Sequence, residues 1–291
     1  MPVADTVKTL LTRGRLQSIS LPIMNGLARL QGRGLRRIFV EDGIWMHQTS
    51  SGYFAYHQPY VRLDLSRLDE IARCHFLWGY TPKAGDVIMD VGAGVGEEAL
   101  TFSRAVGARG KVICIEAHPR TFRCLERLAR YNRLENVIAI HAAATEPGRS
   151  VVTIEDASAY LANRLDAAAG IPIPATTLDA LHQQQNLGRI HFLKMNIEGS
   201  ERLAIHGMTE TLRQTEILCV SCHDFLARRA NDAGLRTKGT VRNFLQQNGF
   251  DVVERLEPGL LPHLGDQLWA YNPALGKKPQ SNALPSLMPR Q

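Results

Sequence analysis

The feature that most constrains the fold is a glycine-rich segment at residues 90–96, Asp-Val-Gly-Ala-Gly-Val-Gly, which directly follows the apolar residues 87–89. A helical pattern continues from it over residues 97–105. An apolar strand that runs through a glycine turn into a helix is how doubly wound α/β domains begin a nucleotide site. Glycine permits positive φ angles and lets a ligand lie against the backbone. We therefore expect ligand contacts from Gly92, Ala93, Gly94 and Gly96.

The spacing of these glycines argues against a nicotinamide dinucleotide as the ligand. The dinucleotide fingerprint requires a glycine three residues after Gly94, where this chain has Glu97. A carboxylate at the start of that helix would repel the pyrophosphate that normally binds there. Asp90, two residues before the first glycine, instead suits a ligand with a cationic amino group.

A second acidic residue stands at the end of the next predicted strand. Residues 111–115 are a strand pattern that ends in Glu116, 20 residues beyond Gly96. A carboxylate at this strand end can accept hydrogen bonds from both hydroxyls of an adenosyl ribose. The alternative is that Glu116 stabilises the N-terminus of the helix predicted around residues 119–131. The glycines at the matching distance favour the ribose.

Composition indicates a folded domain with reduced thiols. The chain has 291 residues, of which 44% are hydrophobic, enough for one large core with appendages. The sequence has no run of about 18 apolar residues and no recognisable signal peptide. Its five cysteines lie mostly in apolar strand or helix patterns, the usual place of reduced core thiols. We therefore expect a cytoplasmic protein.

Positive charge is concentrated at the two ends of the chain. The net charge is +6, with +6 in residues 1–40, +3 in residues 276–291 and −3 between them. Leucines and arginines interleave over residues 1–38. This pattern fits an amphipathic arm for an anionic membrane or a partner, and it also fits a helix packed on the domain with a solvated basic face. We favour the packed helix over both the arm and an organellar transit peptide. The acidic centre argues against nucleic-acid binding.

Strands and helices alternate regularly from residue 85 onward. Strand patterns separated by helical patterns of about a dozen residues predict a doubly wound, mostly parallel seven-stranded α/β sheet. The last two strands have no helix between them, so we expect an antiparallel last strand. The predicted strands are residues 87–91, 111–116, 137–142, 190–196, 216–222, 250–256 and 267–271, the helices are residues 97–106, 119–132, 199–208 and 237–248, and short extra strands are residues 150–156 and 175–177.

The residues that follow each predicted strand are candidates for the site. Ligands of such sheets bind outside the carboxyl ends of the strands, where the strand order reverses. The small side chains of Ala142 and Ala143 would leave room for an adenine ring. The other candidates at strand ends are Glu116, Ala117, Asn196, Glu198, His223 and Asp224.

Five segments together resemble the FkbM-type S-adenosylmethionine (SAM) methyltransferases, which belong to the class I, Rossmann-like methyltransferases. The segments are residues 90–102, 111–119, 132–137, 176–181 and 192–208. The resemblance implies that Asp90, the three glycines and Glu116 bind SAM. It also implies O-methylation of a small-molecule acceptor, a sugar or a secondary metabolite. Asn196 departs from the family pattern, which usually has Asp there, and Asn cannot act as a base.

A hydroxyl acceptor needs a group that takes its proton. His223 is our candidate for the base, with Asn196 orienting the hydroxyl and Asp224 orienting His223 or the substrate. The alternative is that His223 and Asp224 cap the following helix. Glu198 could touch the substrate or the methionine amine, or could stabilise the first turn of its helix. We predict no metal, because neighbouring residues on a strand point in opposite directions.

The chain divides into an N-terminal extension (residues 1–80), a SAM-binding domain (residues 81–272) and a disordered tail (residues 273–291). The extension has a helical pattern, a hairpin about Gly52 and a helix over residues 64–78. Its aromatic stretch at residues 53–60 is the candidate for a substrate lid through Tyr53 and Tyr56, or else an ordinary half-buried hairpin. A SAM-binding scaffold without turnover is the main alternative function, because of Asn196. A nicotinamide-dependent reductase is less favoured, because of Glu97 and the closing pair of strands.

Overall fold

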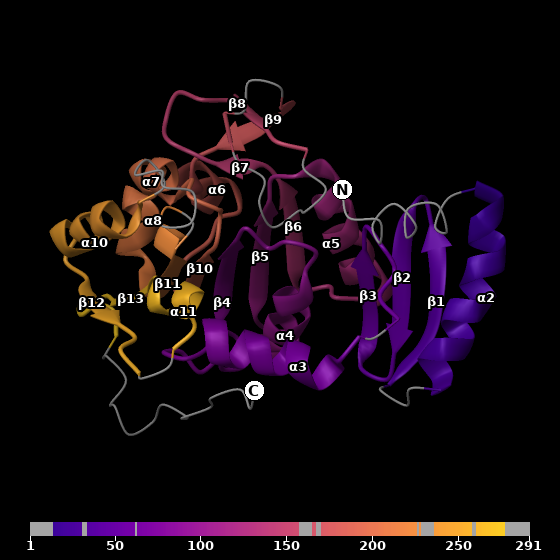
Figure 1. The fold of residues 1–291 in the computed structure, drawn as a ribbon. Helices are drawn as coiled ribbons and strands as arrows, with labels where there is room; N and C mark the ends of the chain where they lie inside the picture. The colour runs from indigo at the N-terminus through magenta and orange to yellow at the C-terminus, as the bar shows by residue number, and fades with distance from the viewer. Residues whose placement is uncertain are drawn as a thin grey trace.

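The computed structural model describes residues 14–30, 34–61, 63–156, 165–166, 170–225, 227, 236–257 and 260–276. A seven-stranded sheet forms the centre, in the order β12-β13-β11-β10-β4-β5-β6 (Figure 1). Its strands are β4 (Val87–Val91), β5 (Lys111–Glu116), β6 (Val137–His141), β10 (Ile190–Met195), β11 (Thr215–Ser221), β12 (Asp251–Glu254) and β13 (Gln267–Tyr271).

The strand directions confirm the predicted doubly wound sheet. Strands β6, β5, β4, β10 and β11 are parallel, whereas β13 is antiparallel to both of its neighbours. Within this sheet the chain forms β4 first and then adds β5 and β6 on one side of it. The chain then crosses to β10, on the other side of β4. The strand order therefore reverses between β4 and β10, which is where ligands of this fold class bind.

Helices cover both faces of the sheet because alternate side chains of each strand point to opposite faces. One face packs against α6 (Leu178–Gln184), α7 (Glu201–Ala204), α8 (Thr209–Arg213) and α10 (Lys238–Gln247). The other face packs against α4 (Glu97–Val106) and part of α5 (Pro119–Tyr131). The single helix predicted over residues 199–208 is instead α7 followed by the 3₁₀ turn η3 (Ile205–Gly207). A short helix α11 (Pro262–Gly265) precedes β13.

The N-terminal extension forms a small sheet of its own. Strands β1 (Leu35–Glu41), β2 (Ile44–Thr49) and β3 (Gly52–Tyr56) are antiparallel. Helix α2 (Gly14–Leu30) packs on β1, and β3 packs on α5, so this sheet lies beside the main domain (Figure 1). The β2–β3 hairpin confirms the prediction about Gly52. Strand β1 was missed, because the register shift at its start places Arg36 and Arg37 in succession on the exposed side.

Two short segments link the extension to the main sheet. Helix α3 (Leu65–Ile71) continues into the π-helical turn η1 (Ala72–Phe76), in place of the single helix predicted over residues 64–78.

Asn132, at the end of α5, holds the β2–β3 hairpin through its side chain, which accepts a hydrogen bond from the Tyr53 amide and donates one to the Tyr53 carbonyl. A Cβ on Gly52 would collide with this side chain, so the contact requires glycine.

The insertion after β6 contains three short strands. Strands β7 (Ala143–Ala144) and β9 (Ile171–Thr176) are parallel, and β8 (Val151–Ile154) is antiparallel to β9. In Figure 1 they lie at the end of the sheet where the parallel strands finish. Strand β9 is longer than the predicted strand over residues 175–177 and includes Pro172 and Pro174, whose side chains are both exposed.

Other expectations concern the cysteines and the chain ends. All five cysteines are free and buried, as predicted. Among the described residues, no helix is long and apolar enough to cross a membrane. The predicted disordered tail lies mostly outside the described residues, which end with a turn at residues 273–276.

A buried ion pair joins the two central strands. Lys194 of β10 is 2.8 Å from the carboxylate of Asp90 on β4, and both side chains are almost completely buried. The Lys194 ammonium also donates to the carbonyl of Gly92 at 2.9 Å and lies over the ring of Phe76 at 4.9 Å. Lys194 is therefore the partner on which the buried Asp90 depends, because within the described part of the chain neither Asp90 oxygen has another hydrogen bond.

We predict that Lys194→Met lowers the free energy of unfolding by about 3–5 kcal/mol, because it leaves the Asp90 charge buried without a partner. The double variant Asp90→Leu, Lys194→Met should recover most of this loss. The control is Arg213→Met, which breaks an exposed pair with Glu210 and should change stability by less than about 1 kcal/mol. Urea unfolding measures all three. Equal stabilities of Lys194→Met and wild type would contradict a structural role for the pair.

Candidate functional site

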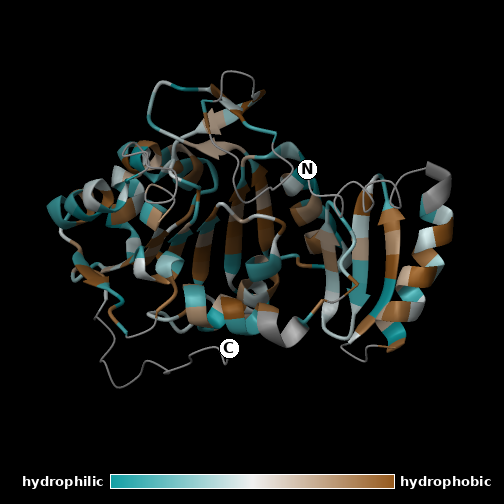
Figure 2. Cartoon of the chain, viewed as in Figure 1, coloured by the Kyte–Doolittle hydropathy of each residue, from teal (hydrophilic) through white to brown (hydrophobic). Residues whose placement is uncertain are grey.

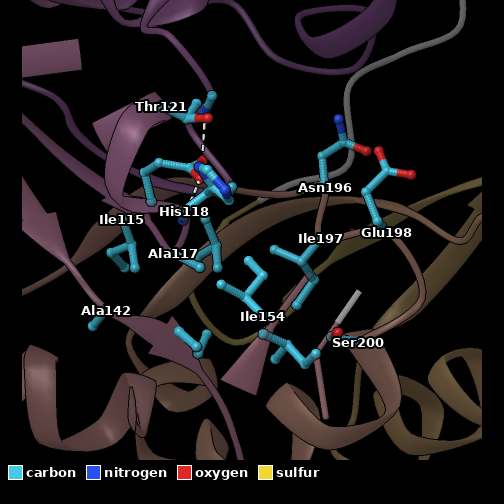
Figure 3. A pocket seen from close by; sticks show the side chains of 17 residues that line it. Ile115, Ala117, His118, Thr121, Ala142, Ile154, Asn196, Ile197, Glu198 and Ser200 are labelled. Carbon is cyan, nitrogen blue, oxygen red and sulfur yellow. Dashed lines mark hydrogen bonds between the residues drawn. The ribbon is translucent and has the colours of Figure 1, made fainter. Parts of the chain in front are cut away.

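A cavity opens at the carboxyl ends of β4, β5 and β10, where the strand order reverses. It encloses about 680 Å³ of empty space, including its opening to solvent. Figure 3 shows its side chains. The cavity is lined by Val91, Gly92, Gly94, Ile115, Glu116, Ala117, His118, Thr121, Ala142, Ala143, Ala144, Ile154, Leu165, Asn196, Ile197, Glu198 and Ser200.

The three glycines of the first loop have different roles. All three have positive φ, between 59° and 91°. A Cβ on Gly92 would collide with the carbonyl of Asn196, and one on Gly96 would press on Leu125 of α5, so these two glycines allow close packing. A Cβ on Gly94 would meet nothing within 4 Å. Gly94 therefore leaves space open beside the cavity, as a ligand that lies against the backbone requires.

Glu116 holds the glycine loop to the end of β5. One carboxylate oxygen accepts from the Gly94 amide at 2.9 Å and the other from the His118 amide at 2.8 Å. Burial raises the pKa of Glu116 to about 6, although these two hydrogen bonds oppose the rise. The carboxylate lines the cavity and each oxygen can accept further hydrogen bonds, so it fits the predicted ribose contact.

One end of the cavity is apolar. Ala117, Ala142 and Ala143 line it from the main sheet, as predicted, and Ile154 and Leu165 line it from the insertion. This end can receive a flat, weakly polar ring such as adenine.

His118 provides polar atoms at the same end. Its ring is nearly fully buried, and Nε2 lies 3.3 Å from a carboxylate oxygen of Asp156. Burial and the neighbouring Arg120 lower the pKa of His118, so the ring is neutral at pH 7 and can donate or accept one hydrogen bond.

The other end of the cavity is polar. Asn196 and Glu198 follow β10 and lie across the view in Figure 3 from Ala117 and Ala142. Glu198 has a φ of 53°, in the left-handed region that side chains other than glycine rarely adopt. Backbone strain of this kind is concentrated at functional sites.

His223 lies between two carboxylates. Its Nε2 is 3.2 Å from Glu198 Oε1 and its Nδ1 is 3.2 Å from Glu201 Oε1. Burial alone would lower the pKa of His223, but the hydrogen bonds and negative charges of the two glutamates outweigh burial and raise it to about 10. The ring is therefore a cation at neutral pH and cannot accept a proton. The prediction that His223 is the base therefore has no support from this geometry.

Glu201 organises the loop between β10 and α7. It is fully buried, and one of its oxygens accepts from the amides of Ile197 and Gly199. Its other oxygen accepts from the hydroxyl of Thr237. The loop that carries Asn196 and Glu198 is thus fixed from behind by a carboxylate that does not itself line the cavity.

Several predicted site residues do not line the cavity. Asp90 is paired with Lys194 beneath the glycine loop, and Ala93 is buried in that loop. Asp224 accepts hydrogen bonds from the amides of Thr237 and Lys238 and so stabilises the start of α10. This is the helix-capping role that the sequence offered as the alternative for Asp224. Their predicted contacts with the ligand or the substrate have no support from this geometry.

The predicted aromatic lid also lies elsewhere. Tyr56 is buried and donates a hydrogen bond to Glu97 of α4 at 2.5 Å. Tyr53 packs against the ring of Tyr131 on α5. Both side chains lie in the interface between the N-terminal sheet and the main domain. This geometry supports the alternative prediction, an ordinary half-buried hairpin.

Some lining residues were not predicted from the sequence. Ile154 and Leu165 come from the insertion, whose contact with the site depends on how the chain folds back after β6. Thr121 and Ser200 begin helices just beyond predicted strand-end positions, so the same rule extended by a few residues would have found them. His118, in the loop that follows β5, also lines the cavity.

Comparison with known proteins supports a methyltransferase. Residues 90–252 match the family described as the methyltransferase FkbM domain. Among solved structures, the chain is similar to a methyltransferase FkbM from Methylobacillus flagellatus KT (16% identity, TM-score 0.44, covering 64% of this chain and 43% of that one). It is also similar to Aeropyrum pernix fibrillarin in complex with natively bound SAM (14% identity, TM-score 0.43, covering 81% and 98%). Among curated proteins there is no match.

We predict that SAM affinity falls as the pH drops through about 6. Above that pH Glu116 is ionised and accepts strong hydrogen bonds, whereas below it the proton occupies one acceptor. The dissociation constant should rise by up to tenfold per pH unit below 6. Calorimetry between pH 5 and pH 8 measures this change.

The Glu116→Gln variant should bind SAM about tenfold or more weakly at pH 7.5, a loss on the order of 1.5–3 kcal/mol, and without the change near pH 6. The matched control is Glu146→Gln, at a partly exposed carboxylate outside the cavity. An unchanged pH dependence in Glu116→Gln would show that another group titrates.

Proposed function

The chain belongs to the methyltransferase FkbM family, and we propose that it transfers the methyl group of SAM to a hydroxyl of a small-molecule acceptor, a sugar or a secondary metabolite. The observation that carries this proposal is the pair Asn196 and Glu198 at the polar end of the cavity, across from the apolar end. When bound, SAM supplies a methyl group activated by its sulfonium centre. The chain has to orient the acceptor, exclude water and receive one proton.

Glu198 is our candidate for the proton acceptor in place of His223. Its carboxylate and that of Glu116 are the two among the described residues that line the cavity, and Glu116 is our candidate for the ribose contact. As the acceptor oxygen takes the methyl group and the methyl–sulfur bond breaks, the oxygen becomes positively charged and its proton becomes strongly acidic. The carboxylate of Glu198 can therefore take this proton and later release it to solvent.

His223 positions Glu198 instead of reacting. Its charged ring donates one N–H to Glu198 and the other to the buried Glu201, which limits the rotation of the Glu198 carboxylate. The hydrogen bond also helps to hold the unfavourable backbone conformation of Glu198.

Asn196 supports a neutral hydroxyl acceptor. An amide both donates and accepts hydrogen bonds, so it can orient a hydroxyl in a defined direction. Asn in place of the usual Asp removes one negative charge from this end of the cavity and leaves proton transfer to Glu198. A SAM-binding scaffold without turnover is the competing function, and its support is also Asn196.

We predict that Glu198→Gln lowers kcat by about 10²–10⁴-fold, the range for a lost proton acceptor, and leaves SAM affinity within about twofold. The assay follows S-adenosylhomocysteine release with panels of hydroxylated sugars, phenols and amines. The matched control is Glu210→Gln, at an exposed carboxylate of α8, which should keep wild-type turnover. Transfer to amines alone would contradict the hydroxyl acceptor, and SAM binding without turnover on any panel would favour the scaffold.

The pH profile separates Glu198 from His223 as the proton acceptor. If His223 is already charged, kcat at saturating SAM should stay level between pH 7 and pH 9 and fall only as His223 loses its proton near pH 10. A histidine base would instead make kcat decline as the pH drops through about 6.5. That decline in the wild type would restore His223 as the base.

A further inference from the structure

Helix α2 has two apolar faces, and only one of them is covered. Ser20 and Ala28 are buried against the N-terminal sheet, with Leu21 and Met24 packed beside them. The side chain of Asn25 accepts from the Ile38 amide and donates to the Ile38 carbonyl of β1. These contacts fix the rotation of α2 about its axis, so its other face cannot turn inward.

The uncovered face of α2 carries a continuous row of large apolar side chains, which we call the outer stripe. The described residues include seven exposed large hydrophobic side chains, and four of them form this stripe: Ile19 (63% exposed), Ile23 (60%), Leu27 (48%) and Leu30 (85%). Their spacing of four, four and three residues places them along one side of the helix. A contiguous apolar patch of this kind marks an interaction surface.

The elements that carry and adjoin the outer stripe also have exposed basic side chains. These are Arg29 on α2 and Arg36 and Arg37 on β1. In the sequence, residues 1–40 carry a net charge of +6, against −3 for residues 41–275. In Figure 1, α2 forms the end of the molecule farthest from β12, and Figure 2 shows hydrophobic residues along it. The apolar row and these three arginines thus belong to neighbouring elements at one end of the protein.

We propose that the outer stripe attaches the protein to an anionic lipid membrane surface. The four apolar side chains would enter the boundary between headgroups and acyl chains, and the arginines would bind the lipid phosphates, as amphipathic helices with basic residues do. A second copy of the chain is a poorer occupant, because pairing two outer stripes would bring two segments of charge +6 together. The net acidic charge of the remaining chain opposes attachment by other faces.

The test is sedimentation of the purified full chain with vesicles. We expect binding to vesicles that contain about one third phosphatidylserine in phosphatidylcholine, and little binding to phosphatidylcholine alone. Raising the salt from 0.05 M to 0.5 M should weaken binding at least tenfold, because it screens the arginines.

Matched variants separate the apolar and the basic contributions. Ile19→Ser, Ile23→Ser, Leu27→Ser should weaken binding at least tenfold, whereas Val151→Ser, Leu256→Ser, at comparably exposed apolar side chains on other elements, should not. Arg36→Gln, Arg37→Gln should weaken binding about 25-fold, since each arginine near an anionic surface contributes about fivefold. Arg73→Gln, Arg213→Gln is the charge control. SAM affinity, measured at the distant cavity, shows that each variant is folded.

Two results would overturn the proposal. Failure to bind anionic vesicles at low salt, or binding that the stripe variant does not weaken, would show that the stripe does not contact lipid. A wild-type dimer that the stripe variant converts to a monomer, measured by light scattering without vesicles, would show that the stripe is an interface between copies of this chain.

Discussion

The site depends on the contacts that the ammonium group of Lys194 makes. It joins Asp90 of β4 to β10, binds the carbonyl of Gly92 in the glycine loop, and lies over Phe76 of the segment that precedes the main sheet. Because the strand order reverses between β4 and β10, these contacts set the distance between the two halves of the cavity. The acidic residue that opens the glycine motif thus supports the site from beneath.

Two glutamates line the cavity, and their neighbours give them different tasks. Glu116 accepts hydrogen bonds from two backbone amides. Its burial raises its pKa, and its carboxylate suits neutral hydroxyl donors. Glu198 receives a hydrogen bond from the charged ring of His223, which Glu201 binds on its other side, and this contact holds Glu198 at the polar end of the cavity. Residue type alone does not separate these tasks, because burial and partners come from distant parts of the chain.

The sequence predicted the repeating part of the fold and the cofactor side of the site, because strand periodicity, glycine spacing and strand-end position are local properties. The charge of His223 was not predictable in this way, since it depends on Glu201 being buried 22 residues earlier in the chain. The buried position of Tyr56 likewise depends on Glu97, 41 residues away. Strand β1 was missed because its adjacent arginines interrupt the two-residue period of a strand. Strand β9 was predicted too short because of its two prolines.

The most direct test of the account is a crystal structure of the full chain with S-adenosylhomocysteine. We expect the two ribose hydroxyls to donate to Glu116, the adenine to lie between Ala142 and the insertion, and the sulfur to face Asn196 and Glu198. The ligand in the reverse orientation, with its adenine at Glu198, or a ligand outside this cavity would contradict the assignment of both carboxylates.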